Sequence, residues 1–323
     1  MKKNACIMVT GANGLAGSAI VDHLRKRMYT CVVPITRADA DLRDPDTTGF
    51  LFTRIKPEYV IHTAATVYGI GGNMRNQAKS IYDNTMINTN VVHASRDAAK
   101  IVVMGTNAAY PDPSHLPYEE ERIFDGRPHA AEFGYGHAKR HMLAMLECYK
   151  ASHGLDYTYL VSGNLFGPRD RFDVNDGHVL PSLIAKFWQA SQDRLCPVQV
   201  WGDGSASRDF LYSYDLARVV ERVMCGDDPY TDTKGQTSGA INVGSGTMRS
   251  IEYVVKRLCG ISRVGFDRVQ WQREMPNGRK DTRSQLDKLS MLGFSPAWSF
   301  DRALTETWEW YCENRAAGTP GRS

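Results

Sequence analysis

The sequence predicts an α/β protein with a doubly wound parallel sheet, followed by a smaller α/β lobe. Short apolar strands alternate with longer helical stretches through the first half of the chain, and a glycine-rich turn follows the first strand. This alternation is typical of βαβ units, whose strands run parallel. After Pro168 the pattern is less regular, and 323 residues exceed the usual size of one domain, so a second unit is expected.

The first half supplies the strands of the sheet and the helices between them. Each expected strand is a short apolar run, whereas each expected helix is a longer stretch. The strands are expected at residues 5–10, 31–35, 59–62, 101–105 and 157–161. The helices are expected at about residues 16–27, 78–99 and 136–152.

The second half is richer in aromatic, glycine and loop residues. Helices are expected near residues 180–192, 214–224, 250–258 and 301–314, and residues 240–243 are expected to return to the main sheet. The chain therefore divides into three expected parts. They are a first domain of residues 1–167 with segments near 205–217 and 239–250 returning to it, a lobe formed by most of residues 168–315, and a flexible tail of residues 316–323.

Composition argues against several classes of protein. The net charge of +3 is too small for a nucleic-acid-binding face, and no apolar run is long enough to cross a membrane. Seven scattered cysteines without ligand spacing indicate neither a disulfide framework nor a metal site. The chain enters its first strand pattern without a signal sequence, which favours a reduced, cytoplasmic protein.

A glycine-rich turn predicts a dinucleotide site. Gly11, Gly14 and Gly17 form a GxxGxxG pattern between the first strand and the first helix. Glycines keep such a turn tight and let the backbone approach a pyrophosphate at the positive end of the helix. A strand-to-helix turn without a ligand would also explain three glycines, but their place in the first βα unit favours dinucleotide binding.

The end of the second strand bears on which dinucleotide binds. It consists of Pro34-Ile35-Thr36-Arg37, without an acidic residue to hold the ribose 2′-hydroxyl of NAD. The guanidinium of Arg37 can instead hold a 2′-phosphate through two charge-assisted hydrogen bonds. The pattern therefore favours NADP(H), and the alternative is that Arg37 is a solvated surface residue.

Three residues form a candidate proton-transfer site. Tyr135 and Lys139 are four apart in an expected helix, so their side chains share one face. An ammonium beside a phenol favours the phenolate and lowers the pKa of the tyrosine toward neutrality. Thr106 follows the strand at residues 101–105, at the sheet edge where such folds bind ligands. A YxxxK pattern alone is common by chance, but this combination favours catalysis.

A series of motifs extends over about 300 residues of the chain. They occupy residues 11–20, 62–65, 82–87, 105–111, 135–139, 164–168, 177–181, 201–204, 208–211 and 242–244. Together they resemble the extended short-chain dehydrogenase/reductase family, and within it the GDP-L-fucose synthase branch, whose members are GDP-4-keto-6-deoxymannose epimerase/reductases. The resemblance implies a Rossmann-type domain and a C-terminal substrate-binding lobe.

The resemblance also implies roles for individual residues. Tyr135 would protonate the C4 oxygen of the sugar, Thr106 would hold that oxygen, and Lys139 would bind the nicotinamide ribose. His178 would complete the catalytic set, and no metal is implied. The implied NADP(H)-binding residues are Gly11, Asn13, Gly14, Leu15, Gly17, Arg37, Asp41, Leu42, Ala64, Ala65, Asn164 and Leu165. The implied substrate-binding residues are Asn107, Asn164, His178, Lys186, Trp201 and Arg208. Trp201 could equally pack in a core, and Arg208 could form a structural ion pair.

Departures from the family pattern qualify the expected reaction. The family inverts C3 and C5 with a cysteine and a histidine; the histidine corresponds to His178, but the cysteine position is Ala108. Thr66 and Asn13 replace a family lysine and arginine, and a late Pro-Arg-Lys motif aligns poorly with residues 276–283. We therefore expect an NADPH-dependent 4-ketoreductase of a nucleotide-linked sugar, with GDP as the expected nucleotide, with at most a single, slow epimerisation.

Three alternatives remain on the same scaffold. A 4,6-dehydratase would need Asp-Glu after Thr106, where the chain has Asn107-Ala108. A nucleotide-sugar epimerase would retain NAD(P), which Arg37 disfavours, and a non-catalytic dinucleotide-sensing protein would tend to lose Tyr135 or Lys139. Copurification of NAD with no net consumption would support the epimerase.

A homodimer is the expected assembly. The helices expected at residues 78–99 and 136–152 carry apolar residues on more than one side. A helix that is apolar beyond one stripe needs a second surface to cover it. The resemblance supplies one, because such helices pair across a two-fold axis. The residues that motivate this expectation are Met142, Leu143, Met145 and Leu146.

Overall fold

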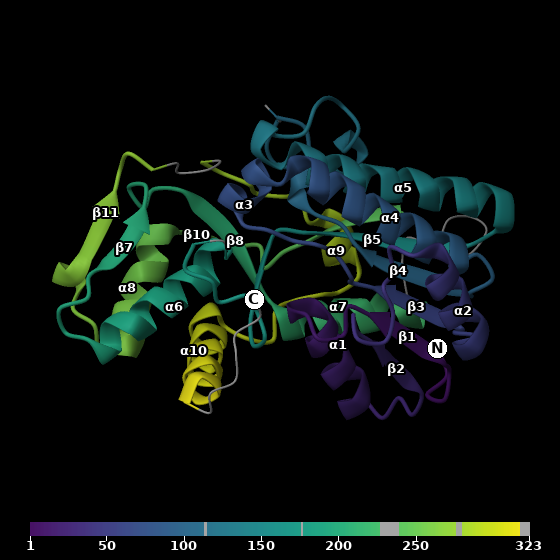
Figure 1. Ribbon diagram of the computed structural model, residues 1–323, viewed down its shortest axis with the longest axis horizontal. Helices are drawn as coiled ribbons and strands as arrows, with labels where there is room; N and C mark the ends of the chain where they lie inside the picture. Colours follow the sequence, from purple (N-terminus) through teal and green to yellow (C-terminus); the bar gives the residue numbers. More distant parts are fainter. Residues whose placement is uncertain (113–114, 176, 227–238, 276–279, 317–323) are drawn as a thin grey trace.

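Six parallel strands form the central sheet of the protein (Figure 1). The computed structural model describes residues 1–112, 115–175, 177–226, 239–275 and 280–316. In spatial order the strands are β2 (Val32–Ile35), β1 (Ile7–Thr10), β3 (Tyr59–His62), β4 (Lys100–Met104), β5 (Asp156–Ser162) and β9 (Gly239–Val243). The chain moves outward from β1 in both directions, so the expected doubly wound fold is confirmed.

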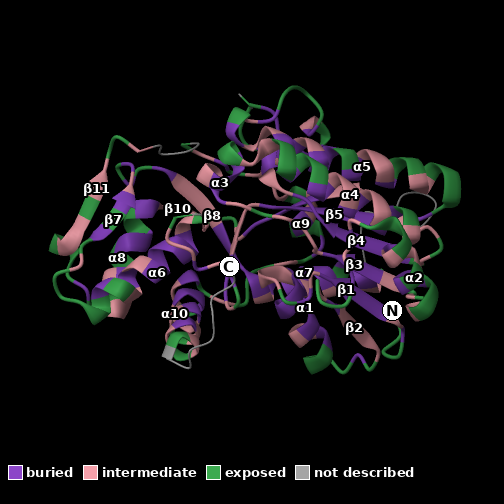
Figure 2. Cartoon of the chain, in the orientation of Figure 1, coloured by how far each residue is buried: buried purple, intermediate pink, exposed green. Residues whose placement is uncertain are grey.

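Helices cover both faces of this sheet. Because successive side chains of a strand point to opposite faces, Ile7 and Val9 join one core and Met8 joins the other. The buried strands lie between the two helical layers in Figure 2. The first face is covered by α1 (Leu15–Lys26) and α7 (Ser213–Cys225), and the second by α2 (Pro45–Ile55), α4 (Gln77–Ala94) and α5 (Phe133–His153).

A second lobe lies beside the carboxyl end of the sheet (Figure 1). It has its own aromatic-rich core, which includes Phe166, Phe187 and Phe210. Its sheets are β10 (Met248–Ser250), β8 (Ser207–Tyr212) and β6 (Asn164–Phe166), and the pair β11 (Val269–Gln272) and β7 (Val198–Trp201). Its helices are α6 (Val179–Gln192), α8 (Ile251–Ser262) and α10 (Phe300–Ala316).

The two lobes exchange segments along the chain. Two elements of the stretches expected to return to the first domain do so: α7 packs against α1, and β9 pairs with β5. Strands β8 and β10 do not, because β8 lies between β6 and β10 in the smaller sheet. The short α9 (Asp287–Met291) contacts β9 on the side of the large sheet. Helix α10 continues through Ala316, and residues 317–323 of the expected tail lie outside the described residues.

Several helices and strands differ from those that the sequence patterns predict. Helix α2 begins at Pro45 after Asp44, whose carboxylate accepts a 3.0 Å hydrogen bond from the Thr47 N–H, a capping signal that the sequence does display. The helix expected at residues 78–99 ends at Ala94, because a turn at Ser95 directs the chain into β4. The sequence patterns also do not predict α9 or the strands β6, β7, β8, β10 and β11 of the smaller lobe. The remaining unpredicted elements are α3 (Ile70–Arg75) and the 3₁₀ helices η1 (Asn107–Ala109), η2 (Glu120–Arg122), η3 (Ala130–Glu132) and η4 (Phe266–Arg268).

The apolar residues of α5 are covered within one chain. Met142, Leu143 and Leu146 are buried in the core between α5, α4 and the sheet, and Met145 packs at its edge. The reason given above for a second covering surface on α5 is therefore wrong. In the described residues, no helix is long and apolar enough to span a membrane.

Candidate active site

A cleft of about 670 Å³ runs along the carboxyl ends of the parallel strands. Gly11, Thr36, Thr63, Gly105 and Gly163, which follow β1 to β5 in turn, all line it. The strand order reverses beside β1, and doubly wound folds bind their ligands at such a switch point. The cleft therefore lies where a dinucleotide is expected.

The glycine turn after β1 has the shape of a phosphate cradle. Gly11 has φ +69°, and a Cβ on it would meet the backbone of Ala64 at 2.7 Å. Gly17 does not line the cleft, but a side chain there would collide with the Gly11 carbonyl and separate α1 from β1. Gly14 caps α1 without a side-chain hydrogen bond, so the N–H groups at the helix start remain available to a pyrophosphate.

The expected adenosine end of the cleft contains two arginines. Arg37 is exposed and lines the cleft, with no hydrogen bond or ion pair to any described residue. Arg43, which sequence reasoning missed, is tied to Asp41 at 2.6 Å and to Asp83 at 3.4 Å. The hydrogen bonds from Arg43 lower the pKa of Asp41 to about 2. Of these two arginines, Arg37 is thus the one whose guanidinium is not engaged by a described carboxylate. The expected cofactor residues Asn13, Leu15, Leu42, Ala64, Ala65, Asn164 and Leu165 also line the cleft.

Tyr135 and Lys139 both line this cleft, on one face of α5. The Lys139 Nζ donates a 2.7 Å hydrogen bond to the Met104 carbonyl and lies 5.8 Å from the centre of the Tyr135 ring. Burial lowers the pKa of Lys139 to about 8. Burial, followed by the negative charge of Glu132, raises the pKa of Tyr135. The expectation that Lys139 lowers the tyrosine pKa is therefore wrong in this state, because desolvation outweighs a distant ammonium.

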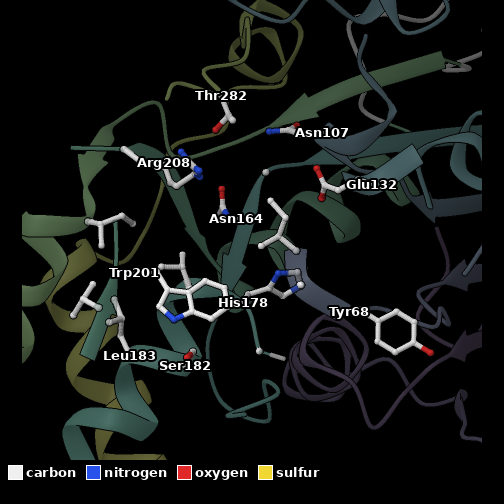
Figure 3. A pocket seen from close by; sticks show the side chains of 18 of the residues that line it. Tyr68, Asn107, Glu132, Asn164, His178, Ser182, Leu183, Trp201, Arg208 and Thr282 are labelled. Carbon is white, nitrogen blue, oxygen red and sulfur yellow. The ribbon is translucent and has the colours of Figure 1, made fainter. Parts of the chain in front are cut away.

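A second cavity of about 260 Å³ adjoins the cleft and reaches into the smaller lobe (Figure 3). Every expected substrate-binding residue lines it: Asn107, Asn164, His178, Lys186, Trp201 and Arg208. Trp201 is only half-buried, and the Lys186 Nζ lies 5.9 Å from the centre of its ring. Burial lowers the pKa of Lys186. The Asn107 Oδ1 is buried without a partner among the described residues, so it is available to a ligand.

The two cavities share one wall. It is formed by Tyr68, Thr106, Glu132, Gly163, Asn164 and His178. Its residues face both the expected cofactor and the expected sugar. His178 lies on this wall at the start of α6, where desolvation by the surrounding residues, followed by the charge of Arg171, lowers its pKa.

Known proteins resemble this chain over most of its length. Residues 7–244 match the model of the NAD dependent epimerase/dehydratase family. The chain belongs to this family. It is 34% identical to the probable GDP-L-fucose synthase 1 of Oryza sativa subsp. japonica over 320 residues, covering 97% of this chain and 93% of the relative. The family expected from the motifs is thereby confirmed.

Two solved structures of Campylobacter jejuni proteins are similar over nearly their whole length. A GDP-6-OMe-4-keto-L-xylo-heptose reductase superposes with a TM-score of 0.87 at 28% identity, covering 97% of this chain and 99% of that chain. A GDP-mannoheptose C4 reductase with NADP bound has a TM-score of 0.84 at 29% identity, with the same coverage.

Beyond the motif residues, the structure places further residues in the lining of the two cavities. Thr282 lines the pocket from a distant segment, and only the tertiary fold brings it there. Glu132 is the N-cap of α5, and the fold places it on the wall that the two cavities share. The family cysteine position, Ala108, is a buried methyl group on the pocket wall. The poorly aligned segment at 276–283 lies partly outside the described residues, at 276–279.

Proposed function

We propose that the protein is an NADPH-dependent 4-ketoreductase of a GDP-linked 4-keto-6-deoxyhexose. The observation that carries the proposal is the wall shared by the dinucleotide cleft and the pocket, where Thr106 and His178 face both cavities. Tyr135 lines the cleft beside this wall. The similar proteins named GDP-L-fucose synthase and GDP-mannoheptose C4 reductase support the substrate class.

In the proposed reduction, one residue transfers a proton and the others hold the substrate or the cofactor. When bound, NADPH supplies the hydride that reduces C4. Tyr135 donates its proton to the C4 oxygen, and its raised pKa keeps the hydroxyl in the protonated state that a donor needs. The Thr106 hydroxyl holds the same oxygen, while Lys139 holds the nicotinamide ribose. Lys186 and Arg208 bring positive charge to the pocket and bind the diphosphate.

The acid/base pair that the family uses for epimerisation is incomplete in this chain. Inversion beside a ketone requires removal of a proton from one face and return of a proton to the other. Ala108 has no titratable group, so the pair used by the family is reduced to His178. We therefore expect deuterium from D₂O to enter at no more than one of C3 and C5. Rapid labelling of both carbons, with GDP-L-fucose as the product, would contradict this.

A substrate panel tests the proposed reaction. The protein and NADPH are incubated with GDP-, UDP- and dTDP-4-keto-6-deoxysugars, and product stereochemistry is determined by NMR. We expect NADPH oxidation and a C4 alcohol with the GDP-sugar. Copurified NAD(P) with interconversion of sugars and no net oxidation of NADPH would instead identify an epimerase with a retained cofactor.

We also propose a homodimer in the cytoplasm. The support for pairing now comes from the outer face of α4, where Ile81 and Tyr82 are exposed to 37% and 65%. Exposed apolar side chains on a long helix suit a two-fold helix pairing. The seven cysteines are all free thiols, which supports a reducing compartment.

A further inference from the structure

Glu132 occupies an unusual position at the start of α5. It is the last residue of η3 and the N-cap of α5, but its side chain makes no capping hydrogen bond. It precedes Tyr135, the third residue of α5, by three residues, and at a helix start the side chains of the N-cap and the third helical residue lie close together. The carboxylate is therefore directed by the same helix that carries the proton donor.

The Glu132 side chain faces the site rather than bulk solvent. It is half-buried and lines both the cleft and the pocket. Figure 3 shows its carboxylate pointing into the pocket, in the region between Asn107 and His178. It makes no hydrogen bond or ion pair with any residue that the structure describes. An unpaired carboxylate at this wall is free to act on a ligand.

The charge of Glu132, and its position on a different element from His178, also suit a role in proton transfer. Its charge contributes, after burial, to the raised pKa of Tyr135. A negative charge is favourable at the N-terminus of a helix, which is where Glu132 stands on α5. His178 enters the pocket from a different element, the start of α6. The two groups can therefore approach one sugar from different directions.

We propose that Glu132 is a catalytic base that removes a proton from a carbon adjacent to the C4 ketone. The inference rests on the proposed 4-keto sugar substrate. The C–H bond breaks, its electron pair forms the double bond of an enolate, and the proton moves to the carboxylate. The hydroxyls of Thr106 and Tyr135, which hold the C4 oxygen for reduction, also stabilise the enolate oxygen.

The proton can return by two routes. Glu132 exchanges its proton with solvent and returns it to the same face, which preserves configuration. His178 instead delivers a proton from its own side, which inverts the carbon. Glu132 thus supplies, from α5, the kind of group that is missing at Ala108 on η1.

Solvent exchange separates this role from reduction. The protein is incubated in D₂O with GDP-4-keto-6-deoxymannose and the other panel sugars, with NADP⁺ and, separately, with NADPH. Label at C3 and C5 is followed by NMR, and reduction by NADPH absorbance. We expect label at one carbon in the wild-type protein. Glu132→Gln should lower that exchange roughly 10²–10⁴-fold, as expected for loss of a general base, and reduction by a much smaller factor.

Two further variants control the experiment. Glu132→Asp keeps the carboxylate and should restore part of the exchange. Glu147→Gln alters an exposed carboxylate on the same helix, outside both cavities, and should change neither rate. Wild-type reduction without any label, or full exchange in Glu132→Gln, would overturn the proposal for Glu132. Equal losses of exchange and reduction would also overturn it, by assigning the carboxylate to binding. Exchange without reduction would support Glu132 but refute the proposed reductase.

Discussion

Lys139 hydrogen-bonds to the Met104 carbonyl, and the Tyr135 hydroxyl is left in surroundings that disfavour a phenolate. Both residues share a face of α5, as their spacing indicates, yet adjacency along a helix does not set a pKa. Burial disfavours the charged form of each group, raising the pKa of Tyr135 and lowering that of Lys139 to about 8. A protonated tyrosine suits the reductive direction, in which the C4 oxygen must receive a proton.

Replacement of Tyr135 tests the proton donor. Tyr135→Phe keeps the ring but removes the hydroxyl, so NADPH binding should be nearly retained while kcat falls by roughly 10²–10⁴-fold. NADPH fluorescence titration and single-turnover reduction measure the two effects separately. A variant that keeps most of its turnover would rule out Tyr135 as the donor.

Replacement of the two arginines in the cleft tests cofactor choice. Arg37→Ala should weaken NADPH binding roughly 10–100-fold, the value of one or two charge-assisted hydrogen bonds, and NADH binding far less. Arg43→Ala is the matched control, because Asp41 and Asp83 already engage its guanidinium. Its effects on the two dinucleotides should be similar. The reverse pattern, with selectivity lost only in Arg43→Ala, would assign the 2′-phosphate to Arg43.

At the scale of elements, the loop after β6 places a carboxyl in the wall of the cleft. Asp170 is buried, with Oδ1 accepting a 2.7 Å hydrogen bond from the Arg171 N–H and Oδ2 unpaired among the described residues. Burial raises the pKa of Asp170 to about 7. The folded state therefore favours the protonated carboxyl, whereas the unfolded chain loses this proton near pH 4. Asp170 consequently lowers the free energy of unfolding as pH rises from about 4 to 7.

Asp170→Asn should remove that cost while keeping the hydrogen bond to Arg171. The cofactor-free variant should melt several degrees above wild type at pH 8, since each kcal/mol shifts Tm by roughly 2–4 °C in proteins larger than 150 residues. At pH 5 the gain should be clearly smaller. Thermal melts at both pH values measure it, and an equal gain at the two would show that the Asp170 carboxyl does not titrate as described.

At the scale of the whole molecule, the outer face of α4 is the expected contact between two copies. Light scattering at micromolar concentration should give about twice the chain mass of 36.1 kDa. Tyr82→Glu places a charge on this face and should shift the protein toward the monomer. Phe50→Glu, a similar change on the exposed side of α2, should leave the mass unchanged. A monomeric wild-type protein would refute the dimer.

The proposed active site contains residues from both lobes. The larger lobe supplies the cleft, the tyrosine and Thr106, whereas the smaller lobe supplies Lys186, Trp201 and Arg208. Strand β6 connects the lobes, since it follows β5 closely and pairs with β8 of the smaller sheet. Asn164, the first residue of β6, therefore lies on the wall that both cavities share.

The sequence by itself determined the features that depend on local pattern. The strand and helix alternation of the first half, the glycine turn at Gly11 and the pairing of Tyr135 with Lys139 on one helix face follow from spacing along the chain. These features predict the fold class, and the motifs spread over about 300 residues add the family. The 3-residue strands β6 and β10 show no such periodicity, because their pairing partners lie far along the chain.

Only the tertiary structure decided the environment of the site. Burial of Met142 and Leu146 within one chain removed an argument for dimerisation, and burial of Tyr135 reversed the expected direction of its pKa. Glu132 became a candidate base only when the fold placed it on the wall shared by two cavities. The physical reason is that desolvation and pocket geometry arise from residues distant in sequence, which no local spacing encodes.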